Sequence, residues 1–302
     1  MNYRLHTAVL LVVLCLGSFS LVAGEKLQVF SVNYPLHYFA QRIGGAHIEA
    51  HFPAPAAVDP AFWTPDIKTV GDYQRADLIL LNGANYSKWV AKVSLPRLRT
   101  VDTSRGFRDQ LMKGAATPTH SHGSTGEHAH QRAAFTTWLD PRLAAQQAKA
   151  IHEALSRRRP DLRQTFLDNY TKLQAELLEL DKAIEQIIAK RPHQPFLASH
   201  PVYQYFIRRY NLNLQSVLWE PDADPSEADW RALQKLTSEH PARWMIWEAT
   251  PKQDTVQQLR LLAVNSVVFN PCANRPEQGD YMTVMADNLL NLETAFPAFG
   301  IN

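Results

Sequence analysis

The sequence predicts an α/β fold of two lobes, each built from about four parallel strand–helix units, bridged by one long α-helix. Three observations support this fold. Short apolar runs alternate with helical patterns between residues 27 and 102, and the same alternation restarts after Pro195. Between the two stretches, residues 161–190 carry one continuous helical pattern. Such alternation is typical of parallel sheets covered by helices on both faces.

The first lobe contains four apolar runs with the length of buried strands. They span residues 27–32, 46–52, 77–81 and 98–102. The helical patterns between them span residues 34–43, 66–75 and 86–90. Gly44-Gly45 ends the first of these helices, and Asn82-Gly83 ends the third strand.

The middle of the chain holds a loop, a helix and then the longest helical pattern. Residues 114–132 are rich in Gly, Ser, Thr and His without periodicity, which predicts a surface loop. Residues 139–155 are predicted to be helical. From residue 161 to 190, apolar residues recur at steps of three and four. This stripe consists of Leu162, Phe166, Tyr170, Leu173, Leu177, Leu180, Ile184 and Ile187. A helix of that length spans about 45 Å, so we expect it to run along both lobes and join them.

The second lobe repeats the pattern of the first. Its predicted strands are residues 196–199, 214–219, 243–247 and 265–269, and its helices are residues 202–210, 226–237, 255–262 and 281–292. His200 and Glu248 each follow a strand directly, and Asp280 precedes the last helix. Ligands of open parallel sheets bind beyond the carboxyl ends of the strands. We therefore expect His200, Glu248 and Asp280 to face the cleft between the lobes.

The first 24 residues are predicted to be a cleaved signal peptide. Arg4 precedes an apolar stretch of about nine residues, and small residues at Ala23 and Gly24 suit cleavage. Leu14 before Cys15 argues against a lipid anchor. Cleavage would leave Cys272 as the only cysteine, which excludes a disulfide framework. We expect the mature protein to be exported and soluble.

Bulk composition agrees with a globular protein of two lobes. The chain has 302 residues, 45% of them hydrophobic and 20% charged, and its net charge of +2 gives no reason to expect nucleic acid as a partner. After the signal peptide (1–24), we predict an N-terminal lobe (25–158), a linking helix (159–190) and a C-terminal lobe (191–302).

Several segments together resemble a known family. They are Val29-Phe-Ser-Val-Asn-Tyr-Pro35, Arg75-Ala-Asp-Leu-Ile-Leu-Leu-Asn-Gly83, Trp138-Leu-Asp-Pro141, Tyr205-Phe-Ile-Arg-Arg-Tyr210, Asp224-Pro-Ser226 and the stretch from Asp280 to Leu289. The chain resembles the periplasmic zinc- and manganese-binding receptors of ABC importers, the ZnuA/TroA type of cluster A-I. The resemblance implies Zn²⁺ (or Mn²⁺) as the transported ligand and an ABC-importer membrane permease as partner. It also implies a periplasmic protein, which we expect to be a monomer.

In that family three histidines and one carboxylate hold the metal. Position by position, the resemblance places the ligands at Ala61, Thr136, His200 and Asp280 of this chain. Alanine cannot coordinate a metal, and a neutral threonine hydroxyl is a poor zinc ligand. The resemblance therefore implies an altered site that retains two of the four ligands.

Other residues could complete such a site. The loop at 114–132 carries four histidines, His120, His122, His128 and His130, and an extended chain from the loop could carry an imidazole into the cleft. We hypothesise a hybrid metal site of His200, Asp280, Glu248 and one or two of these loop histidines.

Plainer interpretations stay open for each of these residues. His200 could hydrogen-bond a neighbouring backbone, Asp280 could cap its helix, and Glu248 could support a helix end. The loop histidines could be incidental, and Cys272 could be a buried filler.

The alternative function is a receptor of the same fold for an organic ligand or metal chelate. Aromatic residues near strand ends could line its pocket: Phe62, Trp63, Trp138, Trp219 and Trp247. No nucleophile, phosphate or dinucleotide motif is present in the sequence, so we do not expect an enzyme.

Overall fold

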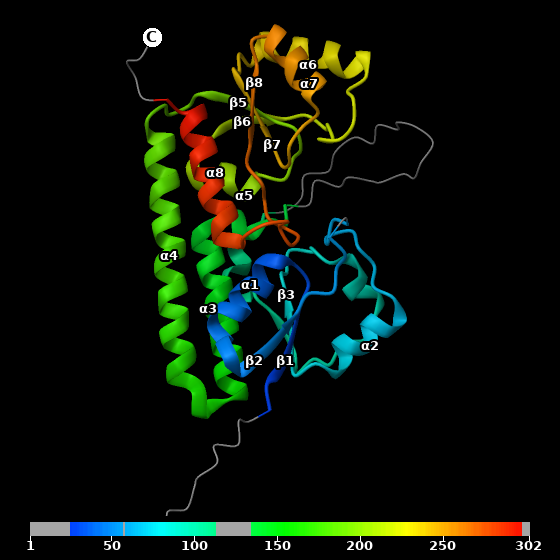
Figure 1. Cartoon of the computed structure of the whole chain (residues 1–302), viewed down its shortest axis with the longest axis vertical. Coiled ribbons are helices and arrows are strands. Elements are labelled where there is room, and N and C mark those ends of the chain that lie inside the picture. Colours follow the sequence, from blue (N-terminus) through cyan, green and yellow to red (C-terminus); the bar gives the residue numbers. More distant parts are fainter. Residues whose placement is uncertain (1–24, 57, 113–133, 298–302) are drawn as a thin grey trace, which may run out of the picture.

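The computed structural model describes residues 25–56, 58–112 and 134–297. Two four-stranded parallel sheets form the centres of two lobes, and one long helix runs beside both (Figure 1). This architecture confirms the predicted fold class. The predicted signal peptide and the histidine loop at 114–132 lie outside the described residues. Within the described ranges, no helix combines the length and apolar composition needed to cross a membrane.

Both sheets have the same strand order. The first is β2-β1-β3-β4, from β1 (Leu27–Ser31), β2 (Ile48–His51), β3 (Leu78–Leu81) and β4 (Thr100–Asp102). The second is β6-β5-β7-β8, from β5 (Pro195–Ala198), β6 (Asn213–Ser216), β7 (Trp244–Trp247) and β8 (Asn265–Val268). In each sheet the second strand of the chain lies on one side of the first strand and the third strand lies on the other, so the strand order reverses between the first and third strands. Ligand crevices of parallel sheets form at this reversal, beyond the carboxyl ends of the strands.

The helices match the predicted ones to within a few residues. They are α1 (Tyr34–Gly44), α2 (Ile67–Arg75), α3 (Pro141–Arg158), α4 (Arg163–Ala189), α5 (Gln204–Tyr210), α6 (Glu227–Glu239), α7 (Gln253–Leu261) and α8 (Tyr281–Ala295). The helix predicted at 86–90 is instead a 3₁₀ segment at Lys88–Lys92. The predicted long helix opens with a 3₁₀ turn at Pro160–Leu162, because proline lacks the N–H that would continue the preceding helix.

Side-chain caps fix where several helices begin. The Asn33 carboxamide accepts a hydrogen bond from the Leu36 N–H at the start of α1. The Asp140 carboxylate caps α3, where Pro141 occupies the first turn. Ser226 and Asp229 form a capping box on α6. Caps of this kind each stabilise a helix by about 1 kcal/mol, so these boundaries follow from the local sequence.

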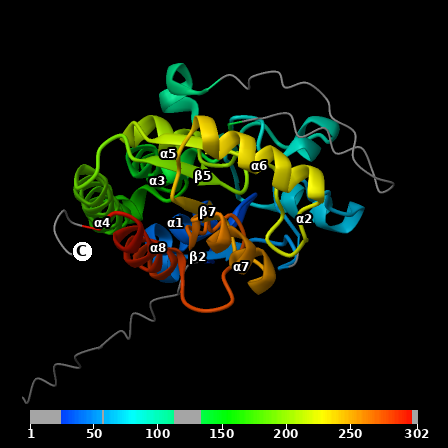
Figure 2. The ribbon, with the colours of Figure 1, turned by 90° about the horizontal axis from the view of Figure 1, so that it is seen from above.

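Helix α4 is the structural connection between the lobes. Its predicted apolar stripe is buried from Phe166 to Ile187. It packs against α1 and α3 of the first lobe and against α8 of the second. Seen from above, α3 and α8 both lie next to it, toward the centre of the molecule (Figure 2). At 1.5 Å per residue, its 27 residues span about 40 Å.

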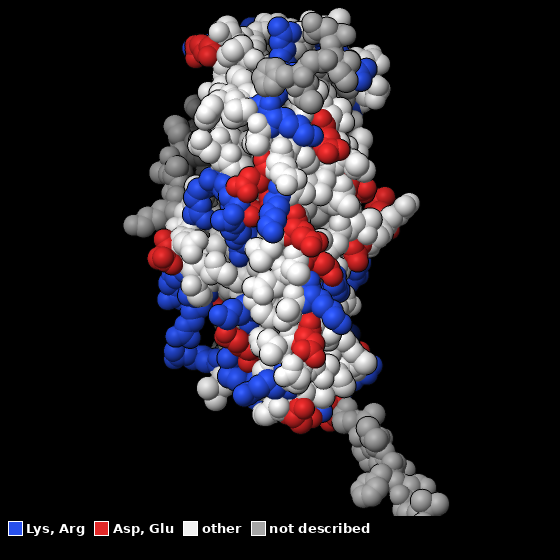
Figure 3. Space-filling view, turned by 90° about the vertical axis from the view of Figure 1, so that its left-hand side faces the viewer, with Lys and Arg blue, Asp and Glu red and all other residues white. Residues whose placement is uncertain are grey.

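A buried carboxylate on α4 ties three helices together. Asp181 is almost fully buried, and its oxygens accept hydrogen bonds from Arg209 Nε (2.7 Å), Arg209 Nη2 (2.7 Å) and Arg142 Nε (2.8 Å). The Tyr210 hydroxyl donates a fourth hydrogen bond at 3.0 Å. Arg142 belongs to α3, and Arg209 and Tyr210 belong to α5 in the second lobe. The Asp181 cluster therefore connects both lobes to α4. On the face of the molecule that carries α4, basic and acidic side chains lie next to one another (Figure 3).

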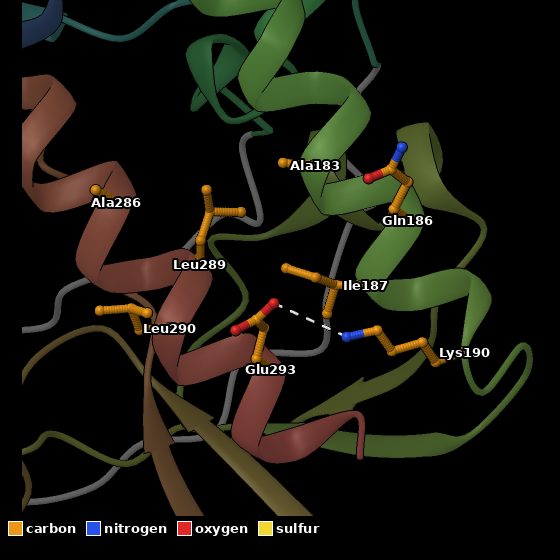
Figure 4. Close-up of a pocket in the computed structure, with 8 residues that line it drawn as sticks. All are labelled: Ala183, Gln186, Ile187, Lys190, Ala286, Leu289, Leu290 and Glu293. Carbon is orange, nitrogen blue, oxygen red and sulfur yellow. Dashed lines mark ion pairs between the residues drawn. The ribbon is translucent and has the colours of Figure 1, made fainter. Parts of the chain in front are cut away.

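A shallow pocket lies between α4 and α8 near one end of the molecule. Ile187 and Leu289 contribute apolar surface to it, and Lys190 pairs with Glu293 at 3.8 Å across it (Figure 4). None of the residues expected in the cleft lines this pocket.

Candidate metal centre

Three potential metal ligands gather at the carboxyl edge of the second sheet. Strands β5 and β7 are neighbours there, on either side of the reversal in strand order. His200 follows β5 by two residues, Glu248 follows β7 directly, and Glu220 lies in the segment after β6. The sequence of this lobe thus delivers one imidazole and two carboxylates to one crevice.

The three side chains are close enough to share one ion. One potential ligand atom from each of His200, Glu220 and Glu248 lies within 4.8 Å of the other two. His200 Nε2 is 3.5 Å from Glu220 Oε1, and His200 Nδ1 is 3.6 Å from Glu248 Oε1. The side chains of His200 and Glu248 are 12% and 26% exposed, whereas that of Glu220 is 54% exposed. Glu220 therefore forms the solvent side of the group.

A backbone carbonyl fixes the orientation of the imidazole. His200 Nδ1 lies 3.3 Å from the carbonyl oxygen of Trp219. When Nδ1 carries the proton, it donates to this oxygen, and Nε2 is left with its lone pair for a cation. Metal-binding histidines commonly use one ring nitrogen in this way to fix the other.

The electrostatic field at the crevice favours a cation. Burial raises the pKa of Glu248, and the neighbouring carboxylates of Glu220 and Asp59 raise it further, while His200 lowers it. Burial likewise raises the pKa of Asp59, and Glu220 adds to the rise against the opposing effects of the Ala61 N–H and His200. Crowded carboxylates repel one another, and a divalent cation among them removes that penalty.

Asp59 brings a carboxylate from the opposite lobe. It lies in the loop between β2 and α2, and its Oδ1 accepts a hydrogen bond of 2.8 Å from the Ala61 N–H. The second lobe holds this loop, because the Asn274 side-chain amide donates to the carbonyl oxygens of Pro55 (2.7 Å) and Val58 (2.7 Å). The crevice thus has acidic groups on both of its sides.

The two positions where the resemblance expects histidine are closed. The Ala61 side chain is buried among apolar neighbours. Thr136 is also buried, and its hydroxyl donates a hydrogen bond to the carbonyl oxygen of Val202. Neither residue therefore supplies a metal ligand: alanine has no ligand atom, and the Thr136 hydroxyl is hydrogen-bonded to the protein backbone.

Asp280 has a different environment from His200. It is the N-cap of α8, where its Oδ1 accepts hydrogen bonds from Thr283 N (2.9 Å) and Thr283 Oγ1 (3.0 Å). Burial, followed by the charge of Asp280, raises the pKa of the nearby Cys272 thiol to about 12. Among the residues described, Asp280 does not join the group of ligand atoms around His200.

The remaining predicted residues divide into two sets. The four loop histidines, His120, His122, His128 and His130, lie outside the described residues. The tryptophans proposed to line an organic-ligand pocket are Trp63, Trp138, Trp219 and Trp247. All but Trp63 are buried in the core, so those three do not line an open cavity.

Sequence reasoning missed Glu220 and Asp59. Glu220 directly follows the predicted strand at 214–219, which is the same signal that identified Glu248. The strand β6 ends earlier, at Ser216, but the following residues stay beside β5, since the Trp219 N–H donates to the Ser199 carbonyl at 2.8 Å. Asp59 carried no comparable signal, because its approach to the crevice depends on how the lobes pack.

Comparison with known proteins gives one consistent family. A family model described as "Zinc-uptake complex component A periplasmic" matches residues 29–295. The zinc-binding lipoprotein AdcA of Streptococcus pneumoniae is 26% identical over 283 residues, which cover 90% of this chain and 56% of AdcA. The high-affinity zinc uptake system protein ZnuA of Bacillus subtilis is 28% identical over 228 residues, 74% of this chain and 72% of that protein. The chain spans about half the length of the AdcA proteins that it matches.

Solved structures have the same fold. The metal-dependent lipoprotein YcdH from Bacillus subtilis superposes with a TM-score of 0.76 at 23% identity, covering 89% of this chain and 98% of that one. The Zn(II)-bound ZnuA-like domain of Streptococcus pneumoniae AdcA gives a TM-score of 0.76 at 23% identity, covering 90% and 99%.

Proposed function

Because this chain belongs to the family of periplasmic zinc-uptake components A, we propose that it is the zinc-binding receptor of an ABC importer, with an altered metal site. The family consists of solute-binding receptors, so the chain is a binding protein and not an enzyme. The observation that carries the proposal is the convergence of His200, Glu220 and Glu248 at the edge of the second sheet. An imidazole and carboxylates are ligands that zinc accepts.

The proposed site is centred on His200 and Glu248, with Glu220 as a third ligand, whereas the sequence suggested His200 and Asp280 as its centre and Glu248 as a further member. Zinc is usually four-coordinate, so one position is left for a further group. Asp59, Asp280 and the loop histidines are the candidates for it. Asp59 is supported by its electrostatic interaction with His200, and Asp280 by the resemblance alone.

The remaining features of the proposal follow the family. The receptor would be exported after removal of residues 1–24 and would act as a monomer with lobes at 25–158 and 191–302, joined through residues 159–190. It would deliver its ion to a membrane permease.

Equilibrium dialysis of the purified protein, lacking residues 1–24, tests the proposal. In separate experiments against zinc, manganese, copper and iron, we expect about one equivalent of zinc to be taken up at micromolar concentration. Uptake of none of these metals at that concentration would contradict the proposal and favour a receptor for an organic ligand or a metal chelate.

The histidine loop gives a separate prediction. We expect that replacing His120, His122, His128 and His130 together by serine lowers zinc affinity on the order of 10-fold, because a loop imidazole then no longer fills the fourth position. Serine keeps the loop length, so the anchored residues on either side are not strained. Isothermal titration with zinc measures the effect.

Deletion of residues 119–131 is the second variant of this test. Unchanged affinity and stoichiometry in both variants would remove the loop from the site and leave Asp59 and Asp280 as the remaining candidates.

A further inference from the structure

Thr136 reaches from the first lobe to the segment that carries His200. Its hydroxyl donates to the carbonyl oxygen of Val202, and the Val202 N–H donates to the carbonyl oxygen of His200 at 3.0 Å. One side chain of the first lobe is therefore hydrogen-bonded to the short turn that carries His200, the imidazole of the candidate metal centre.

The Thr136 side of this contact is rigidly held. The neighbouring Phe135 carbonyl accepts a hydrogen bond of 2.9 Å from Asn82, at the end of β3. The Asn82 carboxamide oxygen in turn accepts from Asn33 (3.1 Å) and Gln147 (3.1 Å), and all three side chains are buried. A connected network of this kind has little freedom to shift. We therefore expect it to hold the Thr136 side chain in a constant position relative to the second lobe.

The turn after His200 is held from its other side as well. The Tyr203 hydroxyl donates to the Phe269 carbonyl at 2.8 Å, next to the end of β8. The Tyr205 hydroxyl accepts from the Met112 N–H of the first lobe at 3.0 Å. Val202, which accepts from Thr136, directly precedes Tyr203, so Thr136 adds a contact from the first lobe close to His200.

We propose that Thr136 is a positioning residue of the metal site, which sets the direction of His200 toward Glu220 and Glu248 through its hydrogen bond to Val202. The proposal rests on the proposed function, since it assigns the residue to the binding of the same cation. At the position where the family resemblance expects a ligand, this chain would use a side chain that aims a ligand instead. Metal ligands must be held to within about 0.5 Å of the productive geometry, and their supporting hydrogen bonds affect affinity strongly.

Thr136→Val tests the proposal because it keeps the branched shape and removes the hydroxyl. We expect zinc affinity to fall about 10-fold, measured by competition with a chelating dye. The visible spectrum of the Co²⁺-loaded protein should also change, because the geometry around His200 changes. Thr136→Ser retains the donor and is expected to restore the affinity to within about threefold and to restore the spectrum.

Thr100→Val is the control, because it removes the same hydroxyl from a site outside this network. The Thr100 hydroxyl donates to the Pro96 carbonyl at 2.9 Å within the first lobe. We expect this variant to lower the melting temperature without changing the zinc affinity or the Co²⁺ spectrum.

The outcomes separate the two proposals. If wild-type protein takes up no metal, the proposed function and the role of Thr136 both fail. If wild-type protein binds zinc but Thr136→Val binds with the same affinity and spectrum, only the positioning role is overturned. Equal losses of affinity in Thr136→Val and Thr100→Val would also overturn it, because the cause would then be general destabilisation.

Discussion

Replacing His200 by alanine is expected to lower zinc affinity by about 100-fold or more. The imidazole is the only nitrogen ligand in the described group around the crevice, and its Nε2 stands beside Glu220 while its Nδ1 faces the Trp219 carbonyl. Loss of a supporting residue around a metal typically costs 10- to 100-fold in affinity, and loss of a ligand is expected to cost at least as much. Zinc titration of the variant by calorimetry or by a competing chelator measures the change.

An exposed histidine at the opposite end of the same strand serves as the control for this experiment. His193 precedes β5, whereas His200 follows it, so the two side chains lie at opposite edges of the sheet. His193 has a positive φ of 65°, which asparagine tolerates. We expect His193→Asn to bind zinc as wild type does. A His200→Ala variant with wild-type affinity would show that the cation binds elsewhere.

Asp181→Asn is expected to destabilise the folded protein by about 3 kcal/mol at pH 7. The substitution replaces a carboxylate by a neutral group while Arg209 stays mostly buried and Arg142 stays nearby. Breaking one partner of a buried ion pair typically costs about 3–5 kcal/mol, because the remaining charge loses its compensation. Urea unfolding followed by circular dichroism measures the free energy of unfolding.

The matched control for Asp181 is Glu185→Gln, one turn later on the same helix. The Glu185 side chain is largely exposed and lies 3.5 Å from Arg209. Exposed pairs contribute at most about 1 kcal/mol, so this variant should unfold close to the wild-type urea midpoint. If both variants shift the midpoint equally, the Asp181 cluster does not have the proposed importance.

The destabilisation by Asp181→Asn should depend on pH. Burial alone would raise the pKa of Asp181, but the hydrogen bonds from Arg209, Arg142 and Tyr210 and the charge of Arg209 outweigh it, so the pKa is lowered. A carboxylate with a lowered folded-state pKa stabilises the protein fully above its unfolded pKa of about 4, and this contribution is lost as pH falls through the folded pKa. The difference in unfolding free energy between wild type and Asp181→Asn should therefore narrow on acidification below about pH 4.

The fold could be predicted because local signals and the global pattern agree. The caps at Asn33 and Asp140, the glycine at position 45 with its φ of 53°, and the stripe from Phe166 to Ile187 each act within a few residues. Strands were recognisable from apolar runs bounded by such signals. Errors occurred where proline or a short 3₁₀ turn changed an element's first residues, as at Pro160.

The site could be predicted only in part, because it depends on contacts between distant segments. His200 and Glu248 follow strands, and the rule for parallel sheets places such residues correctly at one edge. Thr136 looked like a lost ligand, and nothing near it in the sequence indicates its hydrogen bond to Val202 in the other lobe. The approach of Asp59 depends likewise on Asn274, which lies 215 positions later in the chain.

Helix α4 would also limit how the proposed receptor releases its ion. A pair of flexible crossover strands lets two halves swing apart by rotating a few backbone dihedrals, but a continuous helix packed on both halves offers no such pivot. The Asp181 cluster adds charged hydrogen bonds that a wide opening would have to break. If the proposed function holds, we expect the ion to leave through small displacements around Glu220, which is already exposed to solvent, while the rest of the molecule keeps its shape.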